Sequence, residues 1–320
     1  MESKRHRVSV IVGSYRPDRE KLRLTLRSIL LQRESDYEII VADDGSEENY
    51  FTEIARYLDA RGMHDYRLVT YGENRGIVAN MWQAISAASG DYVRLTSPGD
   101  YMHGFHALRD WTRFMDDHPD TAMSFCDAIY YHREGAKIVP TGEYAHPQDT
   151  KGFRGGDSLR AYLINDDICL GAAIMCRREV MSKYLRMLRG KVTWAEDNSY
   201  RLMAYFGEKI RYFPETAVLY EYGTGISTNG SDVWSQRIQA DWRAANAIML
   251  AGTSPIAEKA HVPELLRMYG QRGLRARLKR ICISPSRTLF HLRTRLRPRR
   301  SPCRMDESFI TELLAHDDVS

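Results

Sequence analysis

Residues 73–100 read ENRGIVANMWQAISAASGDYVRLTSPGD and contain one complete unit of the pattern that decides the fold. A helical segment from Ile77 to Ala88 is followed by a short apolar strand, DYVRLT, and then by a polar turn. The same alternation of short apolar strands and helical segments continues on both sides, from Val8 to about Phe125. It predicts an α/β fold with a mostly parallel central sheet flanked by helices.

The other elements follow from the same patterns. Strands are predicted at VSVIV, YEIIVA, YRLVTY and TAMSFC, with helices over residues 22–31, 51–58 and 105–115. Residues 130–157 are rich in Gly, Pro and charge, which predicts a long functional loop. Beyond it we expect a core strand over 168–175, a helix over 196–206 and a strand over 217–220, and then only helices after Gly230. The predicted domains are a catalytic domain over 1–230 and a helical extension over 231–320.

The charge of the chain is unevenly distributed. The formal net charge is +4, but residues 271–304 hold 12 Lys and Arg and no Asp or Glu, which leaves 34 basic against 42 acidic residues elsewhere. Leucines alternate with the arginines of this tail, as in an amphipathic segment on an anionic membrane surface. A solvated helical face is the alternative. No nucleic-acid partner is expected, because no nucleic-acid module or aromatic stacking platform accompanies the charges.

Cysteine usage and hydropathy bear on the compartment. The five cysteines include no CxxC pair, a pattern that resembles neither a disulfide framework nor a zinc site and favours a reducing compartment. No apolar run approaches the roughly 18 residues of a membrane span. We therefore expect a cytoplasmic protein whose membrane association, at the inner face of the plasma membrane, is peripheral.

The predicted strands end in unusually polar residues. In parallel sheets ligands bind beyond the carboxyl ends of the strands, so four of these ends would meet at one polar rim. The residues at these ends are Gly13 to Arg16, Asp43 to Ser46, Gly72 to Gly76 and Ser97 to Asp100.

Five segments, in this order, resemble the family 2 glycosyltransferases, which have the nucleotide-sugar-binding GT-A fold. They are VSVIVGSYR, EIIVADDGS, the stretch 73–100, WAEDNSYRLMAYFG and YEYGTGIS, and together they span Val8 to about Thr228. The resemblance implies an inverting enzyme that transfers a sugar from a nucleotide-diphosphate donor to a hydroxyl of a glycan or lipid-linked acceptor. Surface polysaccharide or glycan assembly is the role that it suggests.

The resemblance also implies donor-binding residues. Ser14, Tyr15 and Arg16 would frame the base and ribose, and Arg75, at a helix N-terminus, would contact base or phosphate. Of the adjacent acids, one would cap its turn while the other, Asp43 in preference to Asp44, contacts the donor. The full set is Ser14, Tyr15, Arg16, Asp43, Asp44, Asn74, Arg75, Gly76, Ser97, Tyr222 and Ser227. Asn80 matches a family position too, although a buried structural hydrogen bond explains it equally well.

The metal-binding segment departs from the family pattern. Ser97 and Gly99 stand where the family has acidic residues, and only Asp100 remains as a ligand for Mn²⁺ or Mg²⁺. A hard cation can take its other ligands from diphosphate oxygens and water. The frequent His of the closing segment is also absent, with Gly223 or Thr224 in its place. Both departures weaken the expected metal dependence.

Glu196 and Asp197 match the acidic pair of inverting family members. Asp197 would be the general base, and Glu196 would fix the acceptor or orient its neighbour. Helix N-termini favour acids for electrostatic reasons alone, which is the competing interpretation. A non-catalytic nucleotide-sugar binder or assembly partner is the alternative function, because two metal-binding acids are missing. A dinucleotide-binding dehydrogenase is disfavoured, since no GxGxxG follows the first strand.

Overall fold

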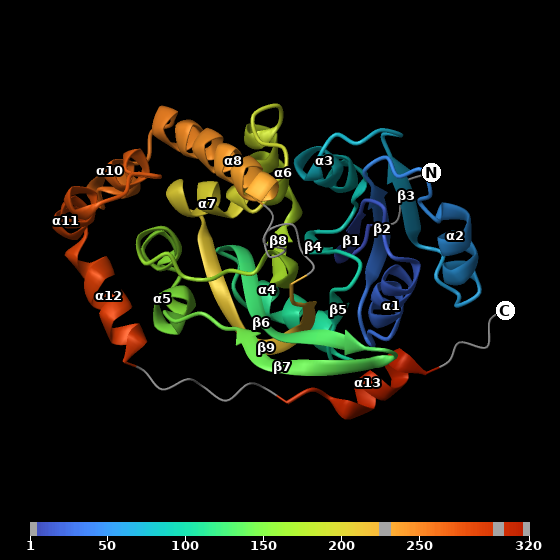
Figure 1. Cartoon of the computed structure of the whole chain (residues 1–320). Coiled ribbons are helices and arrows are strands. Elements are labelled where there is room, and N and C mark those ends of the chain that lie inside the picture. The colour runs from blue at the N-terminus through green and yellow to red at the C-terminus, as the bar shows by residue number, and fades with distance from the viewer. Residues whose placement is uncertain (1–4, 224–231, 297–303, 316–320) are drawn as a thin grey trace.

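The computed structural model describes residues 5–223, 232–296 and 304–315. In this part of the chain nine strands form one sheet in the order β3-β2-β1-β4-β8-β6-β9-β5, with β7 beside β6. Helices lie on both sides of the sheet (Figure 1), so the predicted α/β class is confirmed. The strands are β1 Val8–Ser14, β2 Tyr37–Asp43, β3 Tyr66–Thr70, β4 Tyr92–Thr96, β5 Tyr101–Met102, β6 Thr121–Glu134, β7 Lys137–Ala145, β8 Ile174–Arg177 and β9 Lys209–Glu221.

The first four strands form the parallel part of the sheet. β1 pairs in parallel with β2 and β4, and β2 with β3. The apolar residues of β1 and β2 are buried whichever face they point to, as the uninterrupted apolar runs predict for a sheet covered on both sides. The register places Ser14 beside Asp43, so two of the predicted polar strand ends meet.

The second part of the sheet is mixed. β8 is antiparallel to both β4 and β6, β6 is parallel to β9, and the short β5 is antiparallel to the end of β9. The β5–β9 pairing sets Tyr101 opposite Leu219. It therefore brings Asp100, just before β5, close to Glu221 at the end of β9.

The helices divide between the two faces of the sheet. One core cluster joins α3, α6 and α7 to Ile11, Ile40 and Val93, while the other joins α1, α2 and α4 to Val10 and Val41. The helices are α1 Arg19–Leu30, α2 Phe51–Asp59, α3 Ile77–Ala87, α4 Ala107–Asp117, α5 Thr150–Gly155, α6 Arg178–Leu188, α7 Asn198–Tyr205, α8 Asp232–Ala251, α9 Pro255–Lys259, α10 Val262–Arg267, α11 Leu274–Ile283, α12 Pro285–Arg295 and α13 Glu307–Leu314.

The prediction of a long loop over residues 130–157 was wrong. β6 runs on to Glu134 and pairs antiparallel with β7, so most of the stretch is a hairpin, followed by α5. Pro140 and Gly142 favoured the loop prediction. Among the described residues β7 is an edge strand that pairs with β6 alone, and edge strands tolerate proline because alternate backbone N–H groups point away from the sheet.

Two further predicted elements differ from the structure. The strand expected over 168–175 covers only Ile174–Arg177, because residues 171–173 form a single 3₁₀ turn in which Gly171 lies close to the side chains of Glu196 and Tyr200. The helix expected from Glu196 begins at Asn198, which leaves both acids in the turn before it. The acidic pair therefore stands at a helix start.

The helices after residue 231 divide into two groups. Ala245, Met249 and Val262, from α8 and α10, belong to the same core cluster as α3 and α7. By contrast, α11 and α12 extend along the edge of the molecule (Figure 1) and expose most of their leucines. The chain then returns to the sheet, where Phe309 and Leu313 of α13 are fully buried against Leu24 and Tyr131. The domain boundary at residue 230 stays a prediction.

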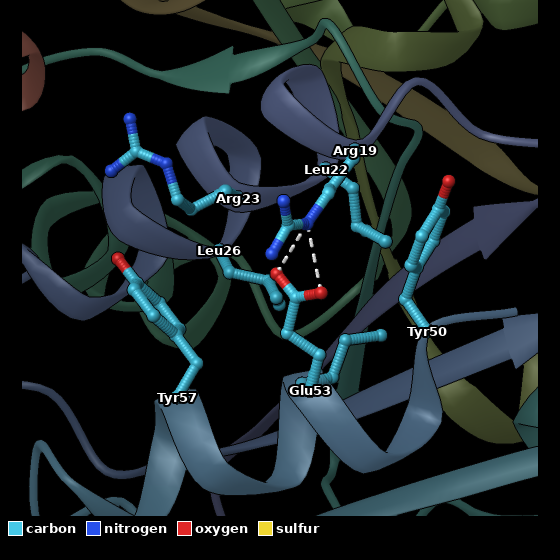
Figure 2. A pocket seen from close by; sticks show the side chains of 8 residues that line it. Arg19, Leu22, Arg23, Leu26, Tyr50, Glu53 and Tyr57 are labelled. Atoms are coloured by element: carbon cyan, nitrogen blue, oxygen red, sulfur yellow. Dashed lines mark hydrogen bonds and ion pairs between the residues drawn. The ribbon is translucent and has the colours of Figure 1, made fainter. Parts of the chain in front are cut away.

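No helix in the described ranges is long and apolar enough to cross a membrane. Figure 2 shows a shallow pocket between α1 and α2, where Arg19 Nε lies 2.8 Å from both carboxylate oxygens of Glu53. Leu22, Leu26 and Tyr57 also line it, and none of the predicted donor-binding residues does. The pocket is therefore a gap where α1 packs against α2, away from the predicted donor-binding residues.

Candidate functional site

The ends of β1 and β2 are tied together by hydrogen bonds. Ser14 Oγ donates to Asp43 Oδ2 at 3.2 Å, and Ser46 donates to the same carboxylate through its backbone N–H and its hydroxyl, both at 2.7 Å. The backbone N–H of Arg16 in turn donates to Ser46 Oγ at 2.7 Å. Asp43, which is fully buried, thus closes its own turn and fixes the loop after β1.

Asp44 links the loop after β2 to the loop after β3. Its two oxygens accept the backbone N–H groups of Arg75 at 2.8 Å and Gly76 at 2.9 Å. Burial raises the pKa of Asp44 and Asp43 adds to the rise, while the two N–H donors oppose it. Gly45 has φ +75° and packs on Glu73, where an added Cβ would lie 2.2 Å from a backbone carbon. The loops after β1, β2 and β3 therefore form one connected unit.

Several predicted donor residues have side chains open to solvent on this unit. Tyr15 is 45% exposed and lies under the guanidinium of Arg16, and Asn74 is exposed as well. Arg75 stacks on Tyr71 and pairs with Glu73 at 2.7 Å. Aromatic, amide and guanidinium groups are thus exposed together on this unit.

Asn80 has a structural role. It is buried, and its side chain donates to the carbonyl of Ala42 at 2.9 Å and accepts from Gln83 at 2.7 Å. These bonds hold α3 against the end of β2, as the structural interpretation of Asn80 predicted.

Asp100 is buried at the end of the turn after β4. Burial raises the pKa of Asp100 to about 7, Arg94 opposes the rise, and Glu221 adds to it. Lys21 Nζ pairs with Glu221 Oε2 at 2.6 Å. Gly99, with φ +100°, lets Glu221 approach this turn, because an added Cβ would lie 2.7 Å from Glu221 Oε2. Glu221 stands next to Tyr222 in the segment YEYGTGIS, but its role depends on the β5–β9 pairing and was not predicted.

The acids around this turn suit a hard cation better than a soft one. Asp100 and Glu221 supply carboxylate oxygens, and Ser97, which is exposed, adds a hydroxyl. Throughout the described residues, no group of three or more His, Cys, Asp or Glu is arranged to hold a metal ion. Mn²⁺ or Mg²⁺ fits here if diphosphate oxygens and water complete its ligand shell.

Arg94 is a second residue that the sequence did not single out. It occupies β4 with no exposed surface, and none of its three guanidinium nitrogens has a hydrogen-bond partner among the described residues. Its guanidinium lies over the ring of Trp111, 5.4 Å from the centroid, and it interacts electrostatically with Cys126, Asp100 and Tyr200. Arg94 is therefore a buried guanidinium, unpaired among the residues described, in the strand that leads into the turn of Asp100.

Glu196 and Asp197 lie side by side at the start of α7, and both keep some exposure to solvent. Burial and the neighbouring Asp197 raise the pKa of Glu196 to about 8. Burial also raises the pKa of Asp197, against the opposing charge of Arg201. Asp197 Oδ1 accepts no hydrogen bond from the described residues. This oxygen is buried. A carboxylate with a raised pKa and an oxygen that no donor occupies is suited to accept a proton from a group bound against it.

Asp241, in α8, holds the loop before this pair. Its carboxylate, which is buried, accepts the backbone N–H groups of Thr193 at 3.2 Å, Trp194 at 2.6 Å and Ala195 at 3.0 Å. The sequence pattern predicts only that Asp241 lies on a helix. Its hydrogen bonds to a loop 46 residues earlier could not be predicted from it.

The closing segment is described only in part. Tyr222 is 49% exposed and stacks on Tyr130, with ring centroids 5.1 Å apart. Ser227, like residues 224–226, lies outside the described residues. The structure thus brings together the polar ends of β1, β2 and β3 through hydrogen bonds. No hydrogen bond or ion pair among the described residues joins Asp100 to the acidic pair.

Three solved structures share this architecture. TarS of S. aureus, residues 1–349 in complex with UDP-GlcNAc, aligns with a TM-score of 0.60 and 16% identity over 89% of this chain and 81% of TarS. The same TarS segment in complex with UDP aligns with a TM-score of 0.56 and 15% identity over 96% of this chain and 89% of TarS. The mannosyltransferase PcManGT of Pyrobaculum calidifontis, in complex with GDP-Man and Mn²⁺, aligns with a TM-score of 0.56 and 16% identity over 97% of this chain and 86% of PcManGT. These likenesses confirm the GT-A fold.

The sequence comparisons identify the family. Two mycobacterial proteins, the uncharacterised Rv1520 of Mycobacterium tuberculosis and Mb1547 of Mycobacterium bovis, are 31% identical over 131 residues. The match covers 41% of this chain and 37% of each relative, so the chain spans little more than a third of their length. A profile described as glycosyl transferase family 2 matches residues 9–185, more than half of the chain. This protein therefore belongs to glycosyl transferase family 2.

Proposed function

We propose that this chain is an inverting glycosyltransferase that moves a sugar from a nucleotide-diphosphate donor to a hydroxyl group of an acceptor. The observation that carries the proposal is the acidic pair before α7, where Asp197 has a raised pKa and an oxygen without a hydrogen-bond partner among the described residues. Family membership supports the reaction class. The connected loops after β1, β2 and β3 provide the rim on which a donor can lie.

The reaction is a single displacement. The acceptor oxygen forms a bond to the anomeric carbon while the bond from that carbon to the diphosphate oxygen breaks. The acceptor proton passes to Asp197, and the bonding electron pair leaves with the diphosphate, so the configuration at the anomeric carbon inverts. Glu196 orients the acceptor beside Asp197.

The donor lies across the polar rim. The exposed rings of Tyr15 and Tyr222 offer stacking faces to a base, and Arg75 is paired with a two-thirds exposed Glu73, which a diphosphate can displace. Asp43 already accepts hydrogen bonds from the hydroxyls of Ser14 and Ser46 and from the backbone N–H of Ser46. A nucleotide group that binds Asp43 therefore competes with these two hydroxyls. The proposed contacts are Ser14, Tyr15, Arg16, Asp43, Asp44, Asn74, Arg75, Gly76, Ser97, Tyr222 and Ser227.

Asp100 is the proposed protein ligand of Mn²⁺ or Mg²⁺, with Glu221 and Ser97 beside it. When bound, the cation stabilises negative charge on the leaving diphosphate. The Mn²⁺ in the PcManGT complex supports this assignment, as does the repulsion between Asp100 and Glu221, which a cation relieves.

Calorimetric titration with uridine, thymidine and guanosine diphosphate sugars, with Mn²⁺, Mg²⁺ or EDTA, tests the proposal. We expect the sugar nucleotides of one base to bind more tightly than those of the other two. A cation should tighten this binding and allow slow hydrolysis of the donor. No binding of any donor would contradict the proposal. Tight binding with neither hydrolysis nor transfer to a panel of acceptors would favour a non-catalytic assembly partner.

We propose further that the acceptor is a glycan or lipid-linked glycan in surface polysaccharide assembly, reached at the cytoplasmic face of the plasma membrane. The segment α11–α12 supports this location. Leu289, Leu292 and Leu296 follow helical spacing, and each is at least 53% exposed, as are Leu274 and Leu278. The surrounding tail carries 12 basic and no acidic residues over 271–304, which complements anionic lipid headgroups.

The variant Leu289→Gln/Leu292→Gln tests the membrane contact in a vesicle cosedimentation assay. We expect it to bind vesicles containing phosphatidylserine at least about tenfold more weakly than the unaltered chain, because two leucines no longer enter the interface. Truncation after Gly270 is less informative, because it also removes α13, whose Phe309 is fully buried. Ile256→Gln, at an exposed position outside the tail, is the matched control. Equal cosedimentation with phosphatidylserine and with pure phosphatidylcholine vesicles would refute the contact.

A further inference from the structure

An aromatic corner stands beside the loop that carries the acidic pair. The rings of Trp194, in that loop, and Trp234, in α8, meet edge to face with centroids 5.0 Å apart at 84°. Both side chains remain partly exposed. Trp194 precedes Asp197 by only three residues, so the corner borders the proposed catalytic base.

A guanidinium covers this corner. Arg237 lies over both rings, 5.4 Å from the centroid of Trp194 and 4.9 Å from that of Trp234. It is exposed, and it has no carboxylate partner among the described residues. Arg75, by contrast, is paired with Glu73. Arg237 therefore presents unused N–H donors beside two apolar ring faces.

One face of α8 builds this arrangement. Trp234, Arg237 and Asp241 follow one another at helical spacings of three and four residues, so they share a face. All three contact the segment 193–195, Asp241 through hydrogen bonds to its backbone. The distance from the corner to the acidic pair is thus fixed by the same helix.

We propose that Trp194, Trp234 and Arg237 form the acceptor-binding site, and that the acceptor is a carbohydrate carrying an anionic group next to the sugar that receives the transfer. The inference rests on the proposed glycosyl transfer. Indole faces pack against the C–H faces of a sugar ring, and a guanidinium binds carboxylate or phosphate with paired N–H bonds. The donor lies at the strand ends of β1 to β3, and the corner lies on the side of Asp197, where the acceptor must approach.

Ligand-observed NMR titration tests the site, with the donor site filled by the nucleoside diphosphate that binds most tightly. The probes are methyl β-glucuronide and glucose 6-phosphate, with neutral methyl β-glucoside as reference. We expect at least one anionic probe to bind about tenfold more tightly than methyl glucoside, because a charge-assisted hydrogen bond forms. A preference for the glucuronide identifies a carboxylate site, and a preference for the phosphate identifies a phosphate site.

Two variants and a control complete the test. Arg237→Gln should remove the preference for the anionic probe, and Trp234→Leu should weaken all three probes. Arg243→Gln, at an exposed arginine of the same helix, should change neither. The inference would be overturned if neither anionic probe bound more tightly than methyl glucoside, or if no probe bound at all. A preference for the anionic probe that survives Arg237→Gln would overturn it too. Donor binding, measured first in the same sample, separates this failure from a failure of the proposed transferase.

Discussion

Asp197→Asn is expected to lower the rate of sugar transfer about a thousandfold while donor affinity stays within about twofold, since general-base catalysis contributes about 10² to 10⁴ in rate. Asparagine has the shape of aspartate but cannot take a proton from the acceptor. Asp197 Oδ1 has no hydrogen-bond partner in the described part of the chain, and an amide in its place can still accept the backbone N–H of Asn198 through its oxygen. Initial rates with donor and acceptor saturating, together with calorimetric donor titration, measure both quantities.

The pH profile provides an independent check on Asp197. The pKa of Glu196 is raised from 4.5 to about 8 by burial and by Asp197, so the pair retains a proton at lower pH. Transfer by the unaltered chain should therefore rise with pH up to about 8. Protonated Glu196 also contributes to the stability of the folded chain. This contribution is complete below pH 4.5 and is lost as the pH rises through about 8. Glu196→Gln is the matched control and should keep measurable transfer. Full activity of Asp197→Asn would show that Asp197 is not the general base.

Asp241→Asn is expected to reduce transfer about a hundredfold, the loss that a displacement of about 1 Å near reacting groups can cause. The buried carboxylate accepts three backbone N–H groups of the loop before Glu196. An amide of the same size offers one oxygen, and its own N–H₂ group faces donors, so the loop must shift. Hydrogen bonds to a charged group contribute about 1.5 to 3 kcal/mol each, and we expect a lower melting temperature as well.

Donor titration and transfer rates of the Asp241→Asn variant separate positioning from general unfolding. Donor affinity should fall much less than the transfer rate. Among the described residues Asp241 has no hydrogen bond to the loops after β1, β2 and β3, and it reaches them only through Thr193, whose carbonyl accepts the N–H of Val78 at 3.1 Å. Asp232→Asn, at an exposed acid of the same helix, is the control and should behave as the unaltered chain does. A transfer rate within about twofold of the unaltered chain would mean that the loop keeps its position without Asp241.

Sequence patterns predicted the parallel strands and the polar ends that meet beyond them, because apolar periodicity is a local property. They failed at β7, where Pro140 indicated a loop although an edge strand tolerates it. Arg94 was equally hidden, since alternation within DYVRLT gives no sign of a fully buried guanidinium. The contacts of Asp241 and Glu221 join segments far apart in the chain, and a single sequence carries no local signal for such pairs.

The hydrogen bonds between the loops of the polar rim have a thermodynamic consequence. Ser46 joins the loops after β1 and β2, and Asp44 joins the loops after β2 and β3, before any ligand arrives. Ordering a loop on binding opposes association through lost conformational entropy, and here most of that ordering is complete in the folded chain. Nucleotide affinity should therefore depend chiefly on contact enthalpy, and nucleotides that differ in base should differ in dissociation rate more than in association rate.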